Sequence, residues 1–517
     1  MSSQNIYFTT PIYYVNDTPH IGHAYTTVVT DILARYHRLF GYNTYFLTGT
    51  DEHGQKVENK AKELQRDPQE YVNETVLRFQ EVWKELNVQH DHFMRTTFPT
   101  HKLGVQRAMQ ELFDKGDIYS ASYEGWYCVS DEIFFTEKDV TDGKCPNGHT
   151  LQKITEKNYF FKMSKYQKQL VDYIESHPEF IQPEFRKNEV LGFLRKPLED
   201  LCISRPKARL SWGIELPFDK DYVTYVWFDA LLNYATAIGY KQDGSQEKFE
   251  KFWPVAHHII GKDILNTHAV YWTTMLFALQ IPLPKMIFAH GWWLTADNAK
   301  MSKSTGVVVK PLDMKNIVGV DPLRYFLARD IFFGNDAQFS KDLVIQRVNS
   351  ELANNFGNLV SRSTNLVCKY FDGKVPEVSE NSPETVQLSK IASQTAQKLK
   401  ADILQLQPNL AIGHVVDLLT EANRYLENRA PWKSAKTDLK MTAETLYAAL
   451  ETLRIAGILL SPVMPTKTQQ VLERVGWTTE PRFEDALHWG LLKPGATVTM
   501  GDPLFQRVEI EKTTQSS

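Results

Sequence analysis

The chain has 517 residues, which at about 150 residues per domain corresponds to three or four domains. Apolar residues make up 42% and charged residues 23%, and no apolar run reaches the roughly 18 residues of a membrane span, which excludes disordered, fibrous and membrane-spanning classes. The net charge of −4 gives no global attraction for nucleic acid, so any such binding has to come from local contacts. We find no secretory signal at Met1, and four cysteines are too few for a disulfide scaffold, so we expect a cytoplasmic protein.

The N-terminal part alternates between strand and helix patterns. Residues 6–10 form a short β-prone run, and a long helical pattern with apolar residues at Val28, Ile32 and Tyr36 follows Pro19. A second apolar run covers residues 44–48. Strand, crossover helix and strand form a βαβ unit, which predicts a parallel sheet.

The pattern changes over residues 117–222, where short aromatic and β-branched runs are separated by turns such as Asp-Gly and Pro-Asn-Gly. We interpret this range as an inserted subdomain. The parallel pattern then resumes with predicted strands at 257–260 and 285–290, joined by a predicted helix over about 264–279.

Only helical patterns follow Asp342. One face of a predicted helix carries Leu388, Ala392 and Leu399, and another carries Leu446, Leu450 and Leu453. Prolines at 408, 431 and 462 mark turns or helix starts. We expect this part to be a helical bundle.

Chemistry-bearing residues first appear at His20-Ile21-Gly22-His23, between a predicted strand and a predicted helix. A helix N-terminus offers free N–H groups, two imidazoles add donors for phosphate oxygens, and Gly22 leaves room for a flat base or a ribose. This suits a nucleoside triphosphate. The alternative for the motif alone is a histidine pair that caps a helix.

A second motif is Lys300-Met301-Ser302-Lys303-Ser304, followed by Thr305-Gly306. Two lysines and two hydroxyls in a short loop would form a clamp for pyrophosphate. Taken alone, a Lys/Ser-rich loop is usually solvated surface.

Together, HIGH at 20–23 and KMSKS at 300–304 resemble, letter for letter, the motifs of class I aminoacyl-tRNA synthetases. Further segments narrow the resemblance to the methionyl-tRNA synthetase (methionine–tRNA ligase) family; they are TTPIYYVN at 9–16, TGTDEHG at 48–54, YVWFDA at 225–230, IGKDI at 260–264 and NNFGNL at 354–359. The resemblance covers essentially the whole chain. It implies an α/β Rossmann-like catalytic domain with an inserted connective, knuckle-like subdomain, followed by an all-α anticodon-binding helical bundle.

The resemblance also implies domain boundaries. We expect a first catalytic half with HIGH, the insertion, a second catalytic half, a KMSKS loop with a stem-contact region, and the anticodon-binding domain, at 1–116, 117–222, 223–296, 297–350 and 351–517.

A methionine pocket is implied from separate segments. Its expected residues are Ile12, Tyr14, Asp51, Trp227, Ala230, Tyr234, Ile264, His268 and Trp272. A thioether favours aromatic edges, so Tyr14, Trp227 and Trp272 would form an aromatic wall, Tyr14 and His268 would reach the sulfur, and Asp51 would hold the ammonium group. The alternative for any single tryptophan is a core residue.

The implied reaction needs no side-chain nucleophile, because the methionine carboxylate attacks the α-phosphorus of ATP and pyrophosphate leaves. Catalysis is then positioning and charge stabilisation. The expected catalytic residues are His20, His23, Lys300 and Lys303, and the expected ATP contacts add Gly22, Gly261, Asp263 and Ser302. Mg²⁺ is expected with the triphosphate. The adenylate then passes methionine to the terminal adenosine of tRNA.

A metal knuckle is a further hypothesis. Cys128, Asp131, Cys145 and His149 lie in the insertion, where related synthetases often carry paired Cys-x-x-Cys arms for tetrahedral zinc. Asp131 stands in place of a cysteine, and His149 follows Cys145 at a wider spacing. Structural zinc and a zinc-free knuckle both remain open.

The expected anticodon contacts are Asn358, Arg362 and Trp432. Asn358 and Arg362 lie one helical turn apart, and Trp432 follows Pro431 near a predicted helix start. An amide, a guanidinium and an indole suit unstacked single-stranded bases, and the resemblance places these three where the family reads the CAU anticodon. Packing in the bundle is the alternative for Trp432.

The expected partners are therefore L-methionine, ATP and tRNA(Met), including the initiator tRNA, and no membrane; we expect a monomer that serves translation initiation and elongation. Two alternatives stay open. One is a class I synthetase for cysteine, leucine or valine, although the insertion is short for the editing domain of the leucine and valine enzymes. The other is an RNA-binding paralogue without catalysis, against which the intact histidines and lysines of both motifs argue.

Overall fold

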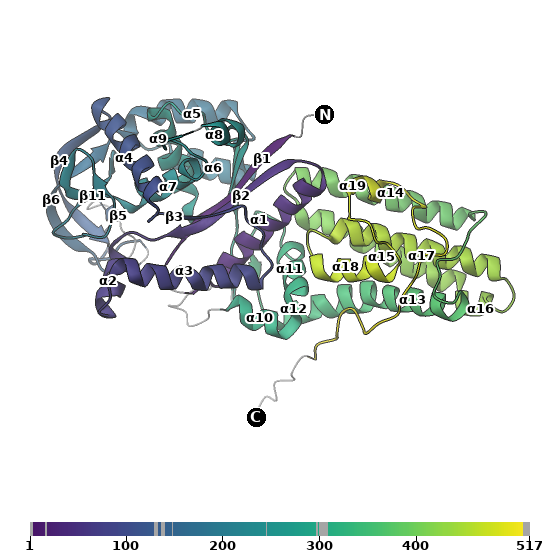
Figure 1. Ribbon diagram of the computed structural model, residues 1–517. Coiled ribbons are helices and arrows are strands. Elements are labelled where there is room, and N and C mark those ends of the chain that lie inside the picture. The colour runs from purple at the N-terminus through teal and green to yellow at the C-terminus, as the bar shows by residue number, and fades with distance from the viewer. Residues whose placement is uncertain are drawn as a thin grey trace.

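A six-stranded parallel sheet forms the centre of the N-terminal body (Figure 1). The structure is a computed structural model that describes residues 4–15, 18–128, 133–135, 140–146, 148–244, 246–295, 298 and 309–509. The strand order is β3-β2-β1-β12-β13-β7, and every neighbouring pair is parallel. The strands are β1 (Asn5–Tyr14), β2 (Asn43–Asp51), β3 (His92–Arg95), β7 (Ile181–Gln182), β12 (Ala256–Gly261) and β13 (Met286–His290).

The order in which strands are added to the sheet reverses between β1 and β12. Strands β1, β2 and β3 follow one another towards one edge, whereas β12 and β13 extend from β1 towards the other. In such sheets a crevice opens outside the carboxyl ends of the strands at the reversal point, and ligands bind there. The fold therefore places a site near the ends of β1 and β12.

Two apolar cores cover the two faces of the sheet. One joins α1 (Ile21–Leu39), α3 (Pro68–Glu85) and α11 (Val320–Arg329) to the C-terminal helices. The other contains α4 (Pro99–Asp114), α7 (Val226–Thr236) and α9 (Thr273–Ala278). Smaller helices complete this body: α2 (Gln55–Glu63), α5 (Gln167–Ser176), α6 (Glu184–Phe193), α8 (Glu247–Phe252), α10 (Pro311–Val318), η2 (Met163–Tyr166) and η3 (Trp253–Val255).

Antiparallel strands occupy much of residues 118–224. The order β5-β4-β6-β8 forms one sheet and β10-β11-β9 a second. Their bounds are β4 (Ile118–Cys128), β5 (Ile133–Phe135), β6 (Gln152–Phe161), β8 (Leu201–Cys202), β9 (Ser204–Pro206), β10 (Glu215–Leu216) and β11 (Asp219–Thr224). Residues 181–182 of this range are β7, which pairs with β13 in the parallel sheet.

The helix expected over 264–279 is divided. A 3-10 turn η4 (Lys262–Ile264) leads to the π-helix η5 (Thr267–Trp272), and only α9 is α-helical. A π turn has one more residue than an α turn, so it rotates the side chains that follow it, and such turns often occur at functional sites. Here it carries His268 and Trp272.

The C-terminal helices pack beside the sheet-containing body, with α1 and α11 between the two (Figure 1). Helix α17 is the centre of this bundle, because every residue from 442 to 460 is buried. The bounds are α12 (Lys341–Arg347), the π-helix η7 (Val348–Gly357), α13 (Asn358–Tyr370), α14 (Pro383–Leu404), α15 (Pro408–Arg429), α16 (Pro431–Ser434), α17 (Leu439–Leu460), α18 (Pro465–Arg474) and α19 (Phe483–Leu487). Strands β14 (Trp293–Leu294) and β15 (Ala337–Gln338) pair near the start of this region.

A buried arginine connects the bundle to the sheet-containing body. Arg324 in α11 pairs with Asp31 of α1 at 2.7 Å, and it also donates to the carbonyl oxygens of Pro462 and Val463 beyond α17, each at 3.0 Å. Both charged side chains are fully buried, so removing one partner would leave an unpaired buried charge. No described helix is long and apolar enough to cross a membrane.

Candidate active site

The two histidines of the HIGH motif form the N-terminus of α1. The imidazole rings of His20 and His23 stack with centroids 3.7 Å apart. His20 is the N-cap residue, and its Nδ1 accepts from the backbone N–H of Gly22 at 3.1 Å, while Nδ1 of His23 accepts from the backbone N–H of His20 at 3.3 Å. The two histidines therefore cap α1, which was one of the two interpretations of the motif.

These bonds determine where the ring protons lie. An imidazole that accepts at Nδ1 carries its proton at Nε2, so His20 and His23 each present an Nε2–H donor. Burial lowers the pKa of His23 well below its usual value, and the neighbouring His20 lowers it further. A Cβ at Gly22 would lie 2.9 Å from Cε1 of His20, so a larger residue there would displace this ring.

The histidines open onto a cavity of about 380 Å³ at the carboxyl ends of the parallel strands. This volume is typical of a small-molecule site. The cavity is lined by all but one of the residues expected for methionine, together with the described residues expected for ATP; these are Ile12, Tyr14, Asp51, Trp227, Ala230, Tyr234, Ile264, His268, His20, Gly22, His23, Gly261 and Asp263.

Trp272 is the exception. It is fully buried, does not line the cavity, and packs behind Tyr234 with ring centroids 6.2 Å apart. Its indole Nε1–H donates to Nε2 of His258 at 3.3 Å. In this structure Trp272 therefore lies behind the cavity lining, and its expected contact with methionine stays a prediction.

His268 lines the pocket, and both of its ring nitrogens form hydrogen bonds. Its Nδ1 donates to the carbonyl oxygen of Ile264 at 2.9 Å, so its Nε2 accepts from the hydroxyl of Tyr234 at 2.7 Å. Burial lowers the pKa of His268 to about 4, which keeps the ring neutral. Both ring nitrogens are engaged, so His268 orients Tyr234 in this structure, and its expected contact with the methionine sulfur stays a prediction.

Gly261 and Asp263 also line the cavity. A Cβ at Gly261 would lie 2.5 Å from Oδ1 of Asp263, so the glycine makes room for this carboxylate. The same oxygen accepts from the indole Nε1–H of Trp292 at 3.2 Å.

Sequence reasoning missed several lining residues, among them Lys56, His290 and Trp292. Lys56 is the only lysine or arginine among the described residues that line the cavity, and its Nζ lies 5.6 Å from the ring centroid of Tyr14. His290 ends β13, and its Nε2 lies 2.8 Å from the hydroxyl of Thr26 in α1. The predicted parallel sheet could have indicated His290, because residues at the carboxyl ends of parallel strands are candidates for lining a ligand site.

The KMSKS residues Lys300, Ser302 and Lys303 lie outside the described residues. The chain is described again from Val309, which lines the cavity. The carbonyl oxygen of Val309 accepts from the backbone N–H of Ile21 at 2.9 Å, so the residue five positions after Ser304 contacts the HIGH motif.

Asp229, His53 and His101 form a buried polar triad, and two of them lie close to pocket residues in the sequence. Asp229 in α7 accepts from Nδ1 of His53 at 2.6 Å and from Nε2 of His101 at 2.7 Å. Burial alone would raise the pKa of Asp229, but the two histidines lower it to about 2. Because His53 follows Asp51 and Asp229 lies between Trp227 and Ala230 in the sequence, the triad joins two walls of the pocket.

The insertion brings three candidate metal ligands together, two cysteines and one histidine. Sγ of Cys128 lies 3.9 Å from Sγ of Cys145, which lies 3.7 Å from Nδ1 of His149. All three ligand atoms are within 4.8 Å of one another. Asp131, the fourth expected ligand, lies outside the described residues.

In the bundle, Arg362 and Trp432 lie together. The guanidinium carbon of Arg362 is 5.0 Å from the indole centroid, and Nη2 of Arg362 donates to Glu427 at 2.8 Å. Asn358 is exposed one turn before Arg362 in α13, and Trp432 is partly exposed. The three predicted anticodon contacts thus retain accessible surface.

Comparison with protein families agrees with this geometry. The model of class I tRNA synthetases (M) matches residues 6–154 and 149–364, and that of the anticodon binding domain of methionyl tRNA ligase matches residues 375–516. A parallel sheet with HIGH at the carboxyl edge beside its reversal point, together with these matches, defines a class I aminoacyl-tRNA synthetase.

Similar proteins narrow the family. The methionine–tRNA ligase of Caldanaerobacter subterraneus subsp. tengcongensis is 45% identical over 512 residues, which cover 98% of this chain and 80% of the relative. That of Clostridium acetobutylicum is 44% identical, with 98% and 79% covered. The structure of Mycobacterium tuberculosis methionyl-tRNA synthetase in complex with methionyl-adenylate is 37% identical with a TM-score of 0.92, and covers 98% of this chain and 100% of that one. The chain belongs to the methionine–tRNA ligase family.

Proposed function

We propose that this enzyme ligates L-methionine to tRNA(Met) through methionyl-adenylate, with release of AMP and pyrophosphate. One observation carries the proposal: an aromatic pocket that ends at Asp51 and the paired imidazoles of His20 and His23 open into the same cavity. An amino acid held in this pocket would present its carboxylate beside phosphate oxygens held at the N-terminus of α1.

Adenylate formation would follow from the way the side chains of the cavity place methionine and ATP. Asp51 would hold the ammonium group, and the methionine carboxylate oxygen would attack the α-phosphorus of Mg-ATP while the bond to pyrophosphate breaks. The Nε2–H groups of His20 and His23 would donate to phosphate oxygens, and Lys300 and Lys303 would stabilise the charge on the departing pyrophosphate. Ser302, Gly261, Gly22 and Asp263 would position ATP. The terminal adenosine hydroxyl of tRNA then attacks the adenylate carbonyl, and AMP leaves.

ATP–pyrophosphate exchange with each amino acid in turn tests the proposal. We expect exchange with methionine, and weak exchange with its isostere norleucine, because apolar pockets separate such analogues by only about 1–3 kcal/mol. Exchange driven best by cysteine, leucine or valine would indicate a different synthetase. Exchange with none of the amino acids would indicate a paralogue without catalysis.

We further infer that the Cys128, Cys145 and His149 cluster holds structural zinc, with Asp131 as the candidate fourth ligand. Tetrahedral zinc with the usual bond lengths places two sulfur ligands about 3.8 Å apart and a sulfur and a nitrogen about 3.6 Å apart. The observed separations of 3.9 and 3.7 Å support this ion.

We also propose that Asn358, Arg362 and Trp432 bind the anticodon of tRNA(Met). Their support is the pairing of Arg362 with the indole and the accessible surface of all three. A guanidinium beside a ring can hydrogen-bond one unstacked base while the ring stacks on another.

A further inference from the structure

The link that carries Trp432 has an unfavourable backbone. Ala430, between α15 and α16, adopts φ 41° and ψ 60°, which is the left-handed region. Residues other than glycine rarely adopt it, and a following proline restricts the backbone further. Such a conformation persists only where the surroundings determine it, and it is typical of functional sites.

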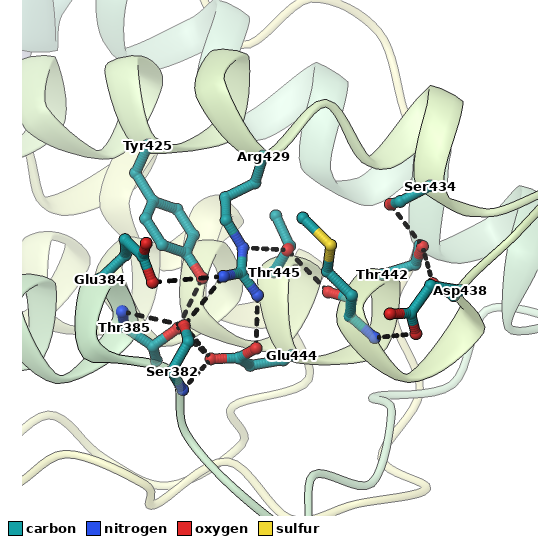
Figure 2. Close-up of polar contacts among 11 residues, drawn as sticks. Ser382, Glu384, Thr385, Tyr425, Arg429, Ser434, Asp438, Thr442, Glu444 and Thr445 are labelled. Carbon is teal, nitrogen blue, oxygen red and sulfur yellow. Dashed lines mark hydrogen bonds and ion pairs between the residues drawn. The ribbon is translucent and has the colours of Figure 1, made fainter.

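The residue before this link is held on several sides. Arg429 donates from Nη1 to the hydroxyl of Ser382 at 2.9 Å and from Nε to the hydroxyl of Thr445 at 3.1 Å, and its Nη2 pairs with Glu444 (Figure 2). The side chains of Arg429 and Glu444 are only 12% and 10% exposed, so water and salt screen the pair little.

Glu444 connects this arginine to the start of α14. One carboxylate oxygen accepts from the backbone N–H and the hydroxyl of Ser382, each at 2.6 Å, and from the hydroxyl of Thr385. The hydroxyl of Thr385 also lies 2.7 Å from that of Tyr425 in α15. Three helices are thereby fixed around the end of α15.

A second anchor follows Trp432. The hydroxyl of Ser434 lies 2.7 Å from that of Thr442, and the side chain of Asp438 caps α17 by accepting from the backbone N–H of Met441 at 2.9 Å (Figure 2). The short segment with Trp432 is therefore held at Arg429 on one side and at Ser434 on the other.

We propose that the Arg429–Glu444 pair, with Ser382 and Thr385, is a positioning network that imposes the left-handed link at Ala430 and so orients Trp432 towards an anticodon base. The proposal rests on the anticodon site proposed above. None of these four residues is among the described residues that line the cavity, so we expect loss of the network to change recognition of tRNA while methionine activation stays intact.

The test compares Glu444→Gln with wild type in tRNA charging and in ATP–pyrophosphate exchange. Glutamine keeps the shape and removes the charge that holds Arg429, so we expect the KM for tRNA to rise about tenfold, with kcat of charging and the exchange rate unchanged. The double variant Trp432→Ala/Glu444→Gln should charge no worse than Trp432→Ala alone.

Glu451→Gln is the matched control. Glu451 also lies in α17 and pairs with an arginine, Arg454, and both side chains are fully buried. They also hydrogen-bond to the backbone of Asp485 and Leu492, away from the segment that carries Trp432. Equal rises in tRNA KM for Glu444→Gln and Glu451→Gln, or none for Glu444→Gln, would overturn the network. If Trp432→Ala itself left tRNA KM unchanged, the anticodon assignment would fall with it.

Discussion

Nε2 of His268 accepts a hydrogen bond from the Tyr234 hydroxyl at 2.7 Å, inside a cavity that both residues line. The bond fixes the direction of the phenol ring, and the neutral imidazole has no N–H left for a ligand. The methionine side chain would then meet an oriented aromatic surface, which suits a polarisable thioether.

His268→Ala should raise the KM for methionine about tenfold and leave the KM for ATP almost unchanged, because it releases the Tyr234 ring without touching the phosphate side. Trp272→Ala should instead mainly destabilise the fold, by about 3–5 kcal/mol, since its indole is fully buried. Methionine- and ATP-dependent exchange and thermal melting separate the two effects. An unchanged KM for methionine in His268→Ala would contradict the assignment of the methionine pocket to this part of the cavity.

Lys303→Ala should slow adenylate formation and spare methionine binding. The lysine acts on charge that grows as pyrophosphate leaves, and one such contact contributes about 2–4 kcal/mol to the transition state, or roughly 30- to 1,000-fold in rate. Pre-steady-state adenylate formation and equilibrium methionine binding measure the two quantities. Lys310→Ala, at an exposed lysine beyond the loop, is the matched control. Equal losses in affinity and rate would contradict the assigned role.

The sequence predicts the main architecture because its signals are local. The βαβ pattern indicates the parallel sheet, and HIGH indicates a helix start after a strand; both are present. The two-residue strand β7 has no periodic signal, and the π-helix η5 differs from an α-helix by one residue per turn, so neither is predictable from pattern.

The missing details of the site depend on tertiary contacts. Whether Trp272 faces the cavity depends on the rotation that η5 introduces, and the engagement of both His268 nitrogens depends on the distant Tyr234. Lys56 in α2 and His290 at the end of β13 reach the cavity only because segments distant in the sequence meet at one edge of the sheet. Residue type and spacing do not encode these relationships.

Cys145→Ser should remove the metal and leave the catalytic centre intact. Thiolates bind zinc far better than hydroxyls, so we expect about one zinc per chain in wild type and little in the variant by elemental analysis. The melting temperature should fall with it. Cys368→Ser, at a described cysteine outside the cluster, should retain the metal. Wild-type protein that stays zinc-free after purification with added zinc would rule out the site.

Acid should destabilise the protein through histidines whose pKa values are lowered in the fold. Burial lowers the pKa of His37 and of His257 to about 4 each, whereas unfolded histidine titrates near 6.5. The unfolded chain therefore binds more protons between these values. Stability is fully present above about pH 6.5 and falls by about 1.4 kcal/mol per pH unit for each such histidine as the pH drops towards 4. Melting curves from pH 7.5 to 5 should show the fall, and His37→Gln should reduce its slope; an unchanged slope would count against this cause.

Trp432→Ala should separate charging from activation. Stacking of a base on an aromatic ring contributes about 1–3 kcal/mol, so loss of the indole should cut tRNA charging by about one to two orders of magnitude. Methionine-dependent ATP–pyrophosphate exchange should be nearly unchanged, because α16 lies in the bundle and the exchange cavity lies at the edge of the parallel sheet. Trp477→Ala removes a partly buried indole from the same bundle and controls for lost packing. Loss of both activities in Trp432→Ala, with early melting, would make Trp432 a packing residue and refute its role at the anticodon.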